Sequence, residues 1–284
     1  IPYNKNHKDL LDILSELIEL GYKNVAIEQI YDHTNVSSND KRNSDPIPNP
    51  ISLDEFNNSL KKRLKLFNRL TIIYGDLSIN TMLRKSTNIR KYNLVATIPT
   101  TEDAFQDSCQ NFSCDIISYN SDTIRTKMSR KYYFLAINRN IVFELKYSPA
   151  IVDSSMRKWI INRAHRYHSY GKSRNVIISS EAMNKFQLRS PYDIANLGLI
   201  FGLSEEQSKN SILSIGRKIL IVAEGRRFGK GAIFIRQNDR SNFDSDDYSE
   251  SESESVEEME EEDEEDLEDS AESCELPFKK AKLE

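Results

Sequence analysis

Short apolar segments alternate with amphipathic ones through about 220 residues of this chain, and this alternation constrains the fold more than any other feature. The apolar segments are nearly uniform in character, which is typical of strands buried on both faces of a parallel sheet. The predicted strands are residues 24–30, 70–74, 93–98, 115–119, 175–179 and 218–223. The pattern predicts an α/β fold with mainly parallel strands, and the number of units favours a closed, TIM-like (β/α) barrel over a doubly wound open sheet.

Helices are expected between these strands, because apolar residues recur there at helical spacing. The clearest stripes predict helices over residues 7–20, 52–67 and 154–170. Residues 132–137 and 141–147 flank a short polar segment. That segment is interpreted either as a hairpin-like turn or as the entry to one long strand.

Three serines mark predicted helix starts. Ser52, Ser190 and Ser204 each stand three residues before a Glu, an Asp or a Gln, which is the spacing of a capping box. Pro191 directly follows Ser190 and suits the first helical position. We therefore predict capped helices after each of these serines.

The formal net charge of −5 hides a division of charge along the chain. Residues 1–240 carry 36 Lys and Arg against 24 Asp and Glu, whereas residues 241–284 carry 3 Lys against 20 Asp and Glu, so the net charges are +12 and −17. We predict a folded domain over 1–240 and a disordered acidic tail over 241–284, whose low apolar content cannot offset chain entropy. A basic domain favours a nucleic acid as partner, and a mildly basic soluble domain without such a partner is the alternative.

The tail ends in a short basic cluster, which is a candidate nuclear-import signal. Its residues are Lys279, Lys280 and Lys282. A chance group of lysines at a solvated terminus is the alternative interpretation.

Residues suited to catalysis are few. The sequence has no Gly-x-Gly-x-x-Gly fingerprint, no Gly-Lys-Ser/Thr phosphate loop and no Gly-x-Ser-x-Gly elbow. His165 and His168 share a predicted helix with arginines that would disfavour a metal cation, and Glu144 and Glu224 are single carboxylates at predicted strand ends. We predict no metal site, no cofactor and no catalytic residue. No apolar run approaches the roughly 20 residues of a membrane span, so no membrane association is expected.

Basic clusters are the stronger candidates for a binding site. Residues 225–231 follow a predicted strand and read as a glycine-flexible loop whose cations could contact phosphates and whose aromatic ring could stack on a base. The candidate RNA-binding residues there are Arg226, Arg227, Phe228 and Lys230. A second basic group surrounds the helix at 154–170 and its exit loop, and its candidates are Arg163, Arg166, Lys172 and Arg174. A third group, at residues 61–69, is open to the alternative of a solvated helix face.

Two stretches carry a family resemblance. Residues 175–180 (NVIISS) and 188–204 (LRSPYDIANLGLIFGLS) resemble the thirty-kilodalton protein subunit of eukaryotic ribonuclease P (RNase P) and ribonuclease MRP. Residues 70–73, 143–151 and 279–282 also match, in order along the chain. Arg189 lies in the most specific stretch and is added to the RNA-binding candidates.

The resemblance implies a TIM-like barrel related to polymerase-and-histidinol-phosphatase domains that has lost its metal ligands. In that family the RNA subunit removes the 5′ leader from precursor tRNA. The protein is expected to support RNase P RNA and MRP RNA, together with other protein subunits and especially a small αβ-sandwich partner. Processing of rRNA precursors implies a nuclear and nucleolar location.

Two departures from the family pattern stand out. The family's opening strand normally begins with an Asp-Leu-Asn-type segment, and the sequence starts after it, so the first strand is expected to be truncated. The acidic block at 244–269 is not a general family feature.

Two other functions stay open at this stage. One is a metal-dependent phosphoesterase on the same TIM-like barrel. The other is a protein-interaction barrel whose basic face binds an acidic partner. The resemblance favours a non-catalytic RNA-binding subunit over both.

Overall fold

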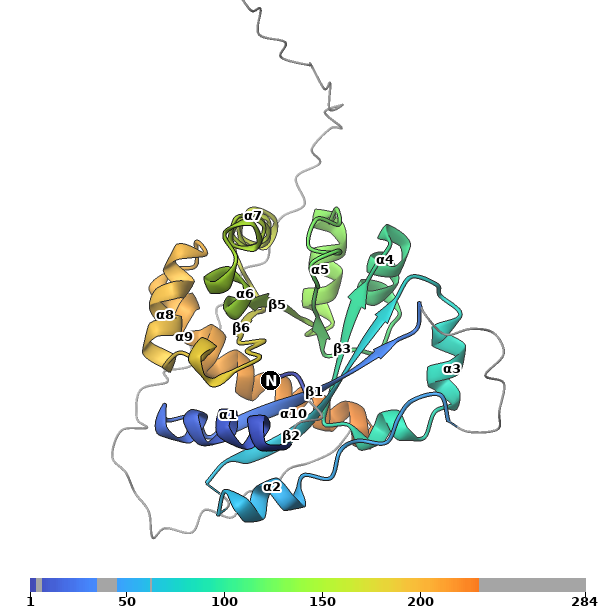
Figure 1. Cartoon of the computed structure of the whole chain (residues 1–284). Coiled ribbons are helices and arrows are strands. Elements are labelled where there is room, and N and C mark those ends of the chain that lie inside the picture. The colour runs from blue at the N-terminus through green and yellow to red at the C-terminus, as the bar shows by residue number, and fades with distance from the viewer. Residues whose placement is uncertain (4–6, 35–44, 62, 230–284) are drawn as a thin grey trace, which may run out of the picture. The chain divides into compact units, whose positions relative to one another are not determined.

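Six parallel strands form the centre of the fold, and they are paired in the order of the sequence, from β1 to β6. The computed structural model (Figure 1) describes residues 1–3, 7–34, 45–61 and 63–229. The strands are β1 (Asn24–Asp32), β2 (Lys65–Tyr74), β3 (Leu94–Pro99), β4 (Ile116–Ile117), β5 (Val142–Lys146) and β6 (Val176–Ser179). The predicted α/β class and parallel strand direction are confirmed.

Helices connect the strands and lie around the sheet (Figure 1). The α-helices up to β6 are α1 (His7–Glu19), α2 (Asp54–Ser59), α3 (Ile79–Lys85), α4 (Glu102–Gln110), α5 (Arg130–Asn138), α6 (Tyr147–Val152) and α7 (Ser154–Gly171). After β6 come α8 (Pro191–Ile200), α9 (Glu205–Ile212) and α10 (Ser214–Phe228). Two 3-10 turns, η1 (Asn88–Lys91) and η2 (Lys185–Gln187), complete the described elements. None of the described helices is long and apolar enough to cross a membrane.

The two faces of the sheet are buried by different helices. Leu70, Val95 and Phe143 belong to the largest apolar cluster, which also takes in side chains of α4, α5 and α7. The alternate strand residues, such as Leu94 and Val142, pack instead against α10 (Figure 1). Alternation along a strand explains this division, because successive side chains point to opposite faces.

The curled sheet is not closed by a β6–β1 strand pair among the described residues. Residues 1–3 lie along β1 through a parallel bridge between Pro2 and Glu28, and the connection after β6 packs its Ala182 and Leu188 with side chains of α1. The Tyr22 hydroxyl also donates to the Arg189 carbonyl at 2.9 Å. The sheet is therefore a partial barrel, which confirms the TIM-like architecture, although the closed form that the number of units favoured does not occur among the described residues.

Capping residues explain several helix starts. Ser190 and Ser204 form the predicted capping boxes with Asp193 and Gln207, and both predictions are confirmed. Ser52 does not cap a helix, since α2 begins after Leu53 without a side-chain cap.

Two predicted elements are wrong. Residues 218–223 are part of helix α10, in which Ile219 and Ala223 are buried four residues apart while Ile221 is exposed. Residues 132–137 belong to helix α5, so neither the turn nor the long strand forms. Both errors arise because a short apolar run fits a strand and a buried helix equally well.

The predicted helix over 52–67 is also too long. Helix α2 ends at Ser59, and β2 already begins at Lys65, which pairs with Asn24 of β1. Leu64 and Phe67 therefore lie at the start of a strand, although their spacing suited a helical stripe.

Candidate nucleic-acid interface and the polar interior of the sheet

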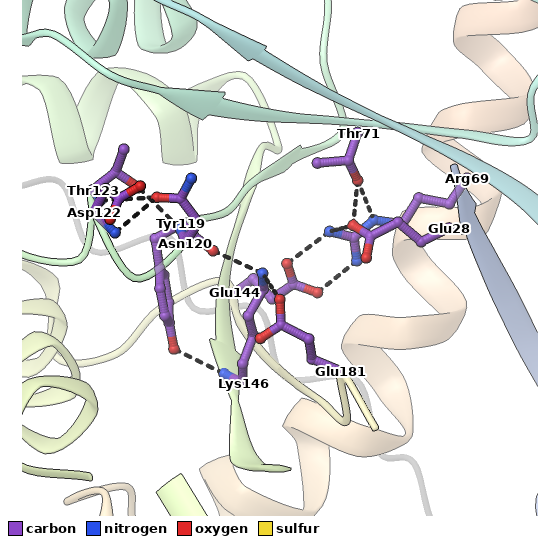
Figure 2. A network of polar contacts seen from close by, with 10 residues as sticks. All are labelled: Glu28, Arg69, Thr71, Tyr119, Asn120, Asp122, Thr123, Glu144, Lys146 and Glu181. Atoms are coloured by element: carbon purple, nitrogen blue, oxygen red, sulfur yellow. Dashed lines mark hydrogen bonds and ion pairs between the residues drawn. The ribbon is translucent and has the colours of Figure 1, made fainter. Parts of the chain in front are cut away.

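A buried ion-pair network lies on the sheet face that α10 also covers (Figure 2). Arg69 of β2 donates from Nη1 and Nη2 to the two carboxylate oxygens of Glu144 on β5, at 2.5 and 2.7 Å. Its Nη2 also lies 3.2 Å from Glu28 Oε1 on β1. The Thr71 hydroxyl donates to the same Glu28 oxygen. One guanidinium thus joins three strands through two carboxylates.

Lys146 forms the second half of the network at the end of β5 (Figure 2). Its Nζ donates to Glu181 Oε1 at 2.5 Å and to the Tyr119 carbonyl at 2.7 Å. Its backbone N–H donates to the Tyr119 hydroxyl at 2.9 Å. The Lys146 side chain is only 3% exposed, whereas that of Glu181 is 27% exposed, so the network reaches solvent on the Glu181 side.

Two cations, Arg69 and Lys146, hold the three carboxylates of the network. Burial alone would raise the pKa of Glu28 and Glu144, but the Arg69 guanidinium outweighs it and holds both pKa values below the usual range. Burial raises the pKa of Glu181, and Lys146 opposes that shift. Glu28 and Glu144 therefore stay ionised at neutral pH, each already paired with a cation.

The position of this network matters for chemistry. Barrel enzymes carry their active sites at the C-terminal ends of the strands, and Lys146 and Glu181 lie at those ends of β5 and β6. Two cations fill the space between the carboxylates, and they would repel a metal ion. In the part of the chain that the structure describes, no group of three His, Cys, Asp or Glu side chains could hold a metal ion.

The predicted glycine-flexible loop at 225–231 is wrong in its first half, because residues up to Phe228 form the last turns of α10. Arg226 Nε donates to both oxygens of Asp115, at 3.0 and 3.1 Å. Arg227 donates to Glu224 and to the Arg90 carbonyl, at 3.0 and 3.2 Å. Phe228 is 68% exposed, with the Arg227 guanidinium 5.2 Å from its ring centre. The other candidate, Lys230, lies outside the described residues.

The candidates around α7 divide into buried and exposed side chains. Arg163 is buried, and it donates to the Tyr167 hydroxyl and to the carbonyls of Thr123 and Ile124. Arg166 is half-buried on the same helix. Lys172 and Arg174 are exposed in the connection from α7 to β6. Arg163 therefore stabilises the fold, and Lys172 and Arg174 are accessible to a ligand.

Arg189 lies in the connection after β6, and its carbonyl accepts the hydrogen bond from the Tyr22 hydroxyl. Its Nη1 donates to the carbonyls of Phe186 and Leu188, at 2.9 and 2.6 Å. The structure thus brings Lys172 and Arg174 to the same end of the sheet as the end of α10, and it leaves Arg163 and Arg189 apart from them. RNA binding by any of these residues stays a prediction, and the candidate import signal Lys279, Lys280 and Lys282 lies outside the described residues.

A protein-family model matches nearly the whole of the part of the chain that the structure describes. The family model described as RNase P subunit p30 matches residues 1–228, which end with the last residue of α10. The chain belongs to the RNase P subunit p30 family. The acidic segment 241–284 lies beyond the matched residues.

Relatives in this family are similar over most of their length. The mouse protein "Ribonuclease P protein subunit p30" is 34% identical over 255 residues, which cover 85% of this chain and 90% of the relative. The Saccharomyces cerevisiae "Ribonuclease P/MRP protein subunit RPP1" is 25% identical over 216 residues, covering 75% and 72%. A chain in the cryo-EM structure of archaeal RNase P with mature tRNA has the same fold, with a TM-score of 0.60 at 16% identity, covering 84% of this chain and 98% of that one.

Most of the interior network was not predicted from the sequence. Glu144 stood out only as a single carboxylate at a strand end, and its partners Glu28, Arg69 and Lys146 were not recognised. Charged residues inside otherwise apolar strands, Glu28 in β1 and Glu144 in β5, were the available signal. Burial of such a residue requires a partner of opposite charge, but the sequence does not say which strand supplies it.

Proposed function

We propose that this chain is a non-catalytic protein subunit of RNase P, which binds and supports the RNA that removes the 5′ leader from precursor tRNA. The observation that carries the non-catalytic role is the interior network. Glu28 and Glu144 are both paired with Arg69, and Lys146 holds Glu181, so no carboxylate of the network is free to act as a base or to bind a metal ion. A metal-dependent phosphoesterase needs such carboxylates unpaired.

Family membership supports the assembly part of the proposal. The mouse relative is named as a subunit of RNase P, and the yeast relative as a subunit of RNase P and MRP. We extend the proposal to MRP RNA and rRNA precursors on that basis. A small αβ-sandwich protein subunit is the proposed protein partner, by the family resemblance.

Purification of the tagged full-length chain from cells, followed by sequencing of the bound RNA, tests this proposal. We expect RNase P RNA and MRP RNA to be strongly enriched, and ultraviolet crosslinks to reach the chain directly. Enrichment of protein partners without any RNA crosslink would instead favour a protein-interaction barrel.

A nuclear and nucleolar location is part of the same proposal. It is tested with a fluorescent fusion of the full chain in which Lys279, Lys280 and Lys282 are replaced by Ala. We expect the unmodified fusion in the nucleolus and the variant mostly in the cytoplasm. An unchanged nuclear signal in the variant would remove the assigned import role from this cluster.

A further inference from the structure

All connections that lead into the strands reach the same end of the sheet, because the strands are parallel. The described residues of these connections are 20–23, 60–61, 63–64, 92–93, 111–115, 139–141 and 172–175. Turn η1 precedes one of them, and the last turn of α10 reaches the same end through the contact of Arg226 with Asp115. We call this set, with η1 and the last turn of α10, the basic rim.

The basic rim holds many cations on adjacent connections. Its exposed cationic residues are Lys23, Lys61, Arg63, Arg90, Lys91, Arg139, Lys172 and Arg174. Lys65, the first residue of β2, is also exposed and lies next to these connections. Hydrogen bonds to backbone carbonyls hold neighbouring parts together. Lys65 N donates to the Lys23 carbonyl at 2.8 Å, and Arg227 Nε donates to the Arg90 carbonyl at 3.2 Å.

Carboxylates do not offset this charge. Within the described residues of the connections themselves, Asp115 is the single acid, and it is buried against Arg226. Glu224 of α10 likewise forms an ion pair with Arg227. Among the described residues, Lys23, Lys65, Arg90 and Arg174 form no ion pair with a carboxylate.

The helix dipole explains only part of this pattern. Helix C-termini point toward this end and favour cations within their last turn. However, α1, α2, α4 and α5 carry no basic residue in the last turn, and the cations follow in the connections. The opposite end mixes exposed cations such as Lys127 and Lys185 with acids such as Asp76 and Asp122.

We infer that the basic rim, at the N-terminal ends of the strands, is the face that binds the phosphate backbone of structured RNA. This inference rests on the proposed function, and it specifies which side of the sheet meets the RNA. Unpaired cations on adjacent connections match a phosphate backbone, and counterion release supplies the binding energy. Exposed Phe228 beside Arg227 adds a ring on which an unpaired base can stack.

Charge reversal on opposite ends of the sheet tests the inference. The rim variant of the full chain replaces Lys23, Lys65, Arg90 and Arg174 by Glu. The matched control, with the same change in charge at exposed positions nearer the other end, replaces Lys127, Lys131, Lys158 and Lys185 by Glu. Binding to RNase P RNA transcribed in vitro is measured over a range of salt concentrations, and circular dichroism melting checks that both variants fold.

We expect the rim variant to bind about tenfold to a hundredfold more weakly at about 150 mM salt, with a shallower salt dependence, because phosphate contacts are lost. The control should bind within about threefold of the unmodified chain, since it leaves those contacts in place. Equal losses in both variants, or a loss in the control alone, would overturn the assignment of the face. If the unmodified chain itself fails to bind this RNA, the proposed function fails, and the inference fails with it.

Discussion

The Arg69 guanidinium lies against the Glu144 carboxylate with two short hydrogen bonds, of 2.5 and 2.7 Å, although β3 and β4 separate their strands in the sheet. The two side chains can meet only because the sheet curls around its interior. Both are almost fully buried, at 9% and 1% exposure. The pair therefore ties β2 to β5 across the hollow side of the sheet, where a barrel enzyme would need open space for a substrate.

Replacing Arg69 by Met should destabilise the fold strongly. The change leaves Glu144 and Glu28 buried without their cation, and loss of one partner of a buried pair typically costs about 3–5 kcal/mol. Urea denaturation measures the free energy of unfolding. The double variant R69M/E144L removes one of the stranded charges and should recover part of the loss. A loss below about 1 kcal/mol in R69M would contradict a structural role for the pair.

Acidic pH should lower the free energy of unfolding, because Glu28 and Glu144 become protonated. The folded pKa values of Glu28 and Glu144 lie below their usual range, because Arg69 outweighs the effect of burial. The unfolded chain therefore binds more protons than the folded one as pH falls below about 5, and the free energy of unfolding then decreases by up to about 1.4 kcal/mol per pH unit for each such group. Above that pH their stabilisation is complete.

The variant E144Q separates this effect from general acid denaturation. Urea midpoints measured between pH 7 and pH 3 should fall less steeply in E144Q than in the unmodified chain. Identical pH slopes would show that folding does not lower the pKa of Glu144.

The close packing of Gly171 gives a third prediction. A Cβ at this position would lie 2.3 Å from Cε1 of Tyr133, whose ring stacks on Phe143 at 4.5 Å between centroids. G171A should therefore cost about 1–3 kcal/mol through overpacking. The matched control is G216A in α10, where nothing lies within 4 Å of the added Cβ, and it should stabilise the chain by about 0.4–1 kcal/mol. Thermal melting of both variants measures these changes in stability. A G171A variant as stable as the unmodified chain would refute the tight contact.

Asp45 should stabilise the segment before α2. Its carboxylate accepts hydrogen bonds from the Ser86 hydroxyl and from the backbone N–H groups of Thr87 and Asn88, at 2.7, 2.8 and 3.0 Å. These bonds outweigh partial burial and lower the pKa of Asp45 to about 2. D45A should lose about 1–2 kcal/mol at pH 7, as for a lost helix cap.

The effect of D45A should shrink as pH falls from about 4 toward 2, because the unmodified carboxylate then becomes protonated as well. Urea denaturation at pH 7 and pH 2.5 measures both differences. An equal loss at both values would show that the carboxylate charge does not matter.

Local patterns in the sequence predicted the parts of this fold that depend on neighbouring residues. The capping boxes at Ser190 and Ser204 could be read directly, because serine, spacing and acceptor suffice to specify them. The strands β1, β3 and β6 were also found, since uniform apolar runs mark them. Residues 218–223 were misread, because what makes them helical is packing of Ile219 and Ala223 against strands more than 70 residues away.

Ion pairs between residues far apart in the chain could not be predicted from the sequence. Arg69 and Arg226 both read as members of basic clusters, yet each guanidinium is held by a carboxylate far along the chain, Glu144 and Asp115. The basic rim follows from the parallel direction of the strands, which places separate short connections side by side. Its members are scattered singly or in pairs through the sequence, so composition alone did not reveal the surface.

We propose that the interior of the sheet supports the fold and performs no chemistry. The variant E181Q tests it most directly, because Glu181 is the most accessible carboxylate of the network and its amide can still accept the hydrogen bond from Lys146. RNase P particles are assembled with the unmodified chain or with E181Q, and the rate of 5′-leader removal is measured at equal amounts of assembled particle. We predict rates within about twofold of each other. A loss of about a hundredfold or more in intact particles, as expected for a lost general acid or base, would contradict the account.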